Sequence, residues 1–71
     1  MDVKAFYIDL ADWVLTINQQ AQRLTADEYW NYILVTAGAL SKRYKDNPLV
    51  KHIIHAHIDF LEKSWKQQMT A

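Results

Sequence analysis

The sequence predicts an all-α protein, an antiparallel three-helix bundle with helices over about residues 3–23, 26–45 and 48–67. Apolar side chains recur at the three- and four-residue spacing of one helix face, and no stretch alternates apolar and polar residues long enough to form a strand. Two helix-boundary signals, at residues 25–28 and 46–48, divide the chain into segments of helical length. Connections this short make successive helices antiparallel neighbours.

The helix expected over residues 3–23 carries a continuous heptad seam, the pattern that helices bury against one another. Its members are Val3, Tyr7, Leu10, Val14, Ile17, Ala21 and Leu24. Phe6 and Trp13 widen this seam on one side, and Ile8 and Leu15 widen it on the other. Asp2 stands where it can cap the N-terminus of the helix.

Both boundaries have side chains suited to starting a helix. Thr25 and Glu28 fit a capping box, in which each side chain bonds to the backbone N–H of the other residue. At the second boundary Asn47 suits the N-cap, and Pro48 suits the first helical position because it lacks an N–H group. The second and third helices are therefore expected to begin at about residues 26 and 48.

The helix expected over residues 26–45 is apolar around nearly its whole circumference. Between Tyr29 and Val35 only Asn31 is neither apolar nor aromatic. A helix of this kind is normally buried on all sides, and two other helices of this length cannot surround it. Gly38 costs about 1 kcal/mol in mid-helix relative to alanine, which a closely approaching helix would offset.

We therefore expect another protein molecule to cover the second helix, most simply a second copy in a homodimer. The side chains expected at this contact are Ile8, Leu15, Tyr29, Tyr32, Ile33, Val35, Thr36 and Ala39. Tryptophan and tyrosine often anchor such contacts. The function predicted is a non-enzymatic protein–protein interaction module, an adaptor, inhibitor or regulator whose partner is itself or another protein. A compact monomer with its tyrosine rings flat on the surface is the alternative.

The third helix holds every histidine of the chain. His52, His55 and Asp59 share one face, and imidazole and carboxylate groups are common ligands of transition metals. A helical metal-binding protein is thus an alternative prediction. Two further readings are ordinary surface histidines and a pH-sensitive interface, because histidine titrates near neutrality. His57 points elsewhere, into the apolar stripe of the same helix.

Charge is unevenly distributed, although 8 basic and 8 acidic residues balance. Residues 1–30 are acidic overall and residues 31–71 are basic overall. The basic corner consists of Lys42, Arg43, Lys45 and Lys51. This corner suggests a nucleic-acid-binding regulator as another alternative, but recognition normally needs a larger basic excess and a known motif. Basic residues near the C-terminus of a helix are also stabilised by the helix dipole, which is a structural explanation of the same corner.

The composition excludes several classes of protein. No cysteine is present, which rules out a disulfide scaffold, a cysteine zinc finger and a cysteine nucleophile. No nucleophile–base pair or phosphate loop is readable, so neither an enzyme nor a cofactor is expected. The longest uncharged stretch, residues 29–41, is too short to cross a bilayer, and the first residues lack a signal-peptide pattern. We expect one cytoplasmic domain over residues 1–71.

Overall fold

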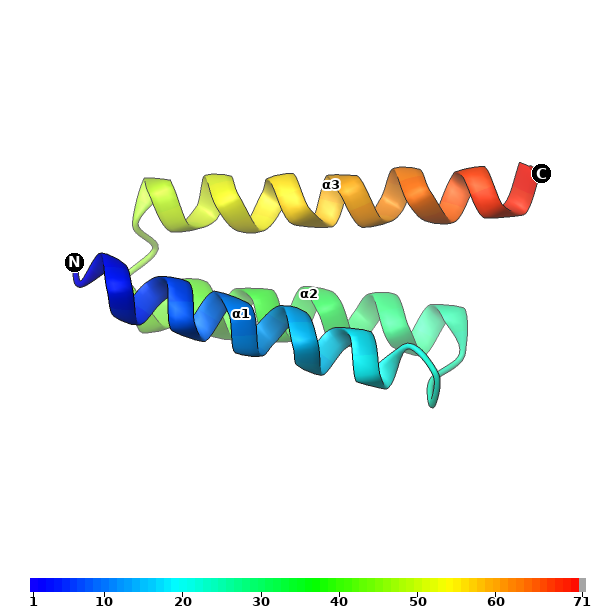
Figure 1. The fold of residues 1–71 in the computed structure, drawn as a ribbon, viewed down its shortest axis with the longest axis horizontal. Coiled ribbons are helices and arrows are strands. Elements are labelled where there is room, and N and C mark those ends of the chain that lie inside the picture. Colours follow the sequence, from blue (N-terminus) through cyan, green and yellow to red (C-terminus); the bar gives the residue numbers. More distant parts are fainter. Residues whose placement is uncertain (71) are drawn as a thin grey trace.

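The computed structural model describes residues 1–70, with side chains described as far as Lys66. Over that range the chain forms three helices, α1 (Val3–Gln20), α2 (Ala26–Arg43) and α3 (Pro48–Thr70), and no strand. The chain runs along α1, turns, returns along α2 and turns again into α3 (Figure 1). The prediction of an all-α three-helix bundle is confirmed.

The helix starts lie where the capping residues predicted them. Asp2 Oδ1 accepts a hydrogen bond from a backbone N–H in the first turn of α1. The Thr25 N–H donates to Glu28 Oε1 at 3.0 Å, and the Glu28 N–H donates to Thr25 Oγ1 at 3.3 Å. The Thr25 backbone N–H, and to a lesser extent the Thr25 side chain, lower the pKa of the Glu28 carboxyl by hydrogen bonding to its charged form. Asn47 Oδ1 accepts from the Leu49 N–H at 2.9 Å and so caps α3.

Three helix ends differ from the prediction, and the third helix continues to Thr70 rather than ending near residue 67. The first helix stops at Gln20 rather than near residue 23, and the second stops at Arg43 rather than near residue 45. At the second site Lys45 and Asp46 both have left-handed backbone, with φ of 57° and 54°. Their N–H groups donate to carbonyls of the last turn of α2, at 3.0 and 2.9 Å. This is a Schellman closure, which ends a helix without requiring glycine.

Lys45 offers a test of this closure. Lys45→Gly is expected to raise the free energy of unfolding by about 1 kcal/mol, because glycine adopts left-handed backbone without the steric cost of a Cβ. Lys51→Gly, within α3, is the matched control and is expected to lower that free energy by about 1 kcal/mol. Urea unfolding of the two variants measures both effects. An equal loss in the two variants would contradict the assignment.

The core lies where α2 packs against both other helices, while α1 and α3 contact each other less. The buried apolar side chains are Phe6, Trp13, Ile17, Ile33, Ala37, Leu40, Val50 and Ile54. A hydrogen bond crosses this core from Trp13 Nε1 to Thr36 Oγ1 at 2.8 Å. The Trp13 indole is therefore buried with its N–H group hydrogen-bonded.

The buried side of α1 includes part of the heptad seam, because Leu10, Val14 and Ile17 of the seam pack in or against the core, but it is shifted toward Phe6 and Trp13. Phe6 and Trp13, expected only to widen the seam, are the buried residues, together with Ile17. Val3 and Tyr7, at the start of the seam, remain about half exposed. The physical reason is that α1 packs mainly on α2. Phe6 and Trp13 face the core in this packing, and the first half of the seam stays exposed.

The prediction for α2 also needs correction. Ile33 was expected at a contact with another molecule, but its side chain is 0% exposed and belongs to the core of this chain. Thr36, expected at the same contact, is half-buried and already accepts the bond from Trp13. Val35, in contrast, is 62% exposed. Gly38 is exposed as well, and nothing lies within 4 Å of the position that its Cβ would occupy, so no helix of the described chain approaches it.

Candidate interaction surface

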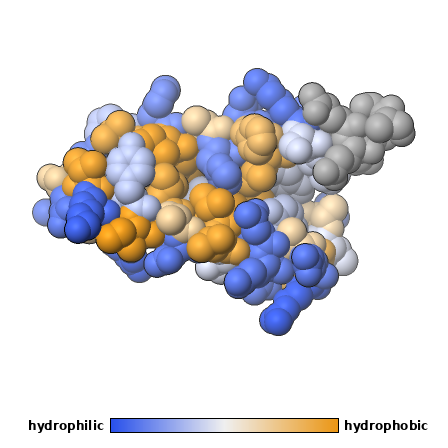
Figure 2. Space-filling view, in the orientation of Figure 1, coloured by the Kyte–Doolittle hydropathy of each residue, from blue (hydrophilic) through white to orange (hydrophobic). Residues whose placement is uncertain are grey.

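An apolar surface extends across α1 and α3. Val3 and Tyr7 of α1 and Leu49 and Phe60 of α3 are among the exposed large apolar residues. Figure 2 shows apolar side chains gathering over both helices at the end of the bundle that holds the N-terminus. We define the α1/α3 face by Val3, Tyr7, Leu10, Val14, Leu49, Ile53, Ala56 and Phe60.

The two helices contribute matching stripes to the α1/α3 face. On each helix the four positions are separated by four, three and four residues, which places them on one side of the helix. The helices lie side by side there, because the rings of Trp13 and His57 are 5.6 Å apart. The sequence prediction missed the α3 half of this surface. The repeated spacing of residues 49, 53, 56 and 60 was the signal that could have shown it.

His57 lies beneath the α1/α3 face. Its ring meets Trp13 edge-on and stacks on Phe60, with centroids 6.4 Å apart in the second pair. The Nε2 atom is buried and has no hydrogen-bond partner among the described residues. Burial lowers the pKa of this imidazole below its usual value, because the charged form would lose its hydration. The apolar surroundings therefore favour the neutral form of the ring.

Acidification provides a test of the His57 environment. Because the folded state lowers the pKa of His57, the unfolded state binds its proton more strongly, and stability falls as the pH drops below about 6.5. His57→Leu is expected to remove much of this loss. Urea unfolding of the two proteins at about pH 7.5 and pH 5.5 measures the difference. Asp9 and Glu28 also have carboxyls with a lowered pKa. Their contributions to stability are lost at a lower pH than that of His57, so they do not obscure the comparison. Equal acid sensitivity of both proteins would contradict the prediction.

Charged side chains concentrate away from the α1/α3 face. The Tyr44 hydroxyl donates to Asp9, and Arg43 lies 3.4 Å from the same carboxylate. The hydroxyl bond is the main reason that the pKa of Asp9 is lowered, and it raises the pKa of Tyr44 in return. This cluster fastens α1 to the end of α2. No member of the α1/α3 face carries a charge.

The residues that sequence reasoning placed at a dimer contact are dispersed over the described chain. Ile8, Leu15, Val35 and Ala39 are exposed, Tyr29 and Tyr32 are half-buried, and burial raises the pKa of Tyr29. Tyr32, Thr36 and Ala39 line a groove between α1 and α2, and the α1 wall of this groove includes Asp12 and Trp13. Ile8 and Leu15 do not line that groove. Only part of the predicted contact therefore forms a common surface.

The predicted basic corner is divided between two places. Lys42 and Lys51 line a groove between α2 and α3, whereas Arg43 pairs with Asp9. Lys45 lies in the α2–α3 turn. Arg43 and Lys45 line a separate hollow, so the four residues form two pairs on two surfaces.

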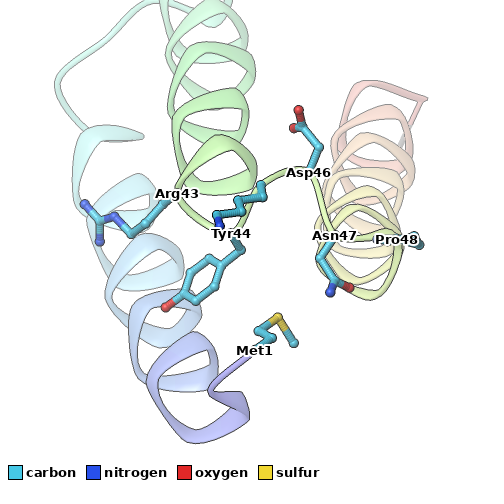
Figure 3. A pocket seen from close by; sticks show the side chains of 7 residues that line it. Met1, Arg43, Tyr44, Asp46, Asn47 and Pro48 are labelled. Atoms are coloured by element: carbon cyan, nitrogen blue, oxygen red, sulfur yellow. The ribbon is translucent and has the colours of Figure 1, made fainter.

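A hollow of about 470 Å³ opens beside the α2–α3 turn, at the end of the bundle that holds the N-terminus. It is lined by Met1 and residues 43–48, several of which Figure 3 labels. Four of its polar side chains have structural partners: Asn47 caps α3, Asp46 accepts from the Ser41 hydroxyl at 2.9 Å, and Arg43 and Tyr44 contact Asp9.

The predicted metal ligands do not come together. Asp59 pairs with Lys63 at 3.0 Å, and both side chains are largely exposed. Among the described residues, no group of three or more histidine, cysteine, aspartate or glutamate side chains could hold a metal ion. The set of His52, His55 and Asp59 is thus not a preformed site.

Over the part of the chain that the structure describes, no helix combines the length and the apolar character needed to cross a membrane. Comparison with protein-family models, with characterised proteins and with solved structures finds no match, so any function must be argued from the residues themselves.

Proposed function

We propose that this chain is a cytoplasmic, non-enzymatic protein–protein interaction module, an antiparallel three-helix bundle that offers the α1/α3 face to another protein molecule. The observation that supports this proposal is the grouping of exposed apolar side chains on two adjacent helices. Tyr7 is 49% exposed and Phe60 is 65% exposed, and neither has a charged neighbour within the face. Contiguous apolar patches on folded proteins commonly mark contact surfaces.

The chemistry of the face fits this role. Interface centres are depleted in charged residues and enriched in aromatic ones, as the α1/α3 face is. The surface is also preformed on two helices, so binding need not order a flexible loop. An adaptor, an inhibitor or a regulator would use such a face in the same physical way, by covering it with the apolar surface of its target.

A matched pair of substitutions tests the proposal. Phe60→Glu places a charge within the α1/α3 face, and Val35→Glu places one at an equally exposed position on α2. With tagged protein expressed in the native cells, proteins captured by the wild type are expected to be lost with Phe60→Glu and retained with Val35→Glu. The reverse result would favour the contact predicted at the exposed side of α2. Equal capture by both variants would contradict the use of either surface.

A further inference from the structure

The chain exposes more surface than a compact monomer of its mass. The chain exposes 5292 Å², whereas a compact monomer of 8.4 kDa exposes about 4,600 Å². Its radius of gyration is 12.7 Å, compared with about 11 Å expected for a compact chain of this length. A standard interface buries about 800 Å² on each partner, which is close to the excess that the chain exposes as a whole.

From this comparison and from the two matching stripes we propose that the occupant of the α1/α3 face is a second copy of the same chain, seated through the same face. This inference rests on the proposed function and names the partner. In such an isologous pair, two copies of α1 and two copies of α3 enclose one apolar layer, and both copies of α2 lie outside it. Each four-three-four stripe then meets a stripe of the same spacing, which suits the packing of side chains between helices.

The charges of the two helices favour one way of pairing them. Asp9 already pairs with Arg43 within one copy, and α1 with its cap still carries Asp2 and Asp12 against a single lysine, Lys4. Basic residues slightly outnumber acidic ones along α3. Laying α1 of one copy over α3 of the other brings an acidic helix beside a basic one, whereas pairing each helix with its own copy does not. The apolar stripes contain no charged residue. Closing the interface over them therefore does not remove a charged group of the stripes from water.

Sedimentation velocity over a range of concentrations tests the proposal directly. Phe60→Glu is expected to raise the dissociation constant about 100-fold or more, because twofold symmetry places the buried charge in the interface twice. Val35→Glu, on the outside of the proposed pair, is expected to change that constant by less than about threefold. Both positions are exposed within one copy, and helical circular dichroism of each variant checks that it is folded.

A spin-label measurement gives a second test that does not depend on a disruptive change. The chain contains no cysteine, so Ala56→Cys and Ala39→Cys each accept one nitroxide, and both positions are exposed helical alanines. Dipolar coupling is expected to give a shorter distance between labels at residue 56, within the face, than between labels at residue 39. The reverse order of distances would overturn the proposed arrangement.

The outcomes separate this inference from the proposed function. A wild-type chain that stays monomeric at millimolar concentration overturns the second-copy occupant. The proposed function survives that result if Phe60→Glu, but not Val35→Glu, abolishes capture of a different protein. A dimer that is lost with Val35→Glu and kept with Phe60→Glu overturns both the occupant and the assignment of the α1/α3 face.

Discussion

Replacing Trp13 with alanine is expected to lower the free energy of unfolding by about 3–5 kcal/mol. The indole is 7% exposed, lies between α1 and α3, and donates its N–H to Thr36 of α2, so one side chain links all three helices. A domain of this length is ordinarily stable by only roughly 4–10 kcal/mol. The loss would therefore consume much of the stability of the chain, and urea unfolding measures it.

One further variant separates the packing of Trp13 from its hydrogen bond, and a second variant serves as a control at another tryptophan. Thr36→Val removes the acceptor and leaves the indole N–H unpaired, at a cost of about 1–3 kcal/mol. Trp65→Ala is the matched control, because Trp65 is 38% exposed and meets the edge of Trp30 near the other end of α3. Equal destabilisation by Trp13→Ala and Trp65→Ala would contradict the central position assigned to Trp13.

The second large effect is expected at Ile33. Ile33→Ala is expected to lower the free energy of unfolding by about 2–5 kcal/mol, because the side chain is fully buried and its removal leaves a cavity. Val35→Ala, two residues away on the exposed side of α2, is expected to change it by about 0.5 kcal/mol or less. Thermal and urea unfolding of both variants, at a concentration where the wild type is monomeric, measure the contrast. A larger loss for Val35→Ala would reverse the assignment of the two sides of α2.

The helix starts could be predicted because their signals are local. A capping side chain and the N–H group that it accepts from are separated by two or three residues, as at Thr25, Glu28 and Asn47. The early end of α2 was harder to predict. Lys45 and Asp46 take up left-handed backbone without glycine or asparagine, the residues that normally signal such an end.

The choice of buried side could not be predicted, because it depends on how the helices pack. Ile33, Leu34 and Val35 are consecutive apolar residues, so the pattern alone gives no reason to bury the first and expose the other two. The same holds for α1, where the regular seam was a better heptad than the side bearing Phe6 and Trp13. Phe6 and Trp13 are buried together with Ile17 of the seam, whereas Val3 and Tyr7 at the start of the seam became part of the candidate surface.

The attachment of α3 mainly through α2 has a consequence for how the native state opens. A helix held chiefly on one side can detach while the other two remain paired, so its backbone amides would exchange with deuterium before those of α1 and α2. Mass spectrometry of the exchanging chain would then report two cooperative units, a hairpin of the first two helices and a third helix that opens at lower free energy.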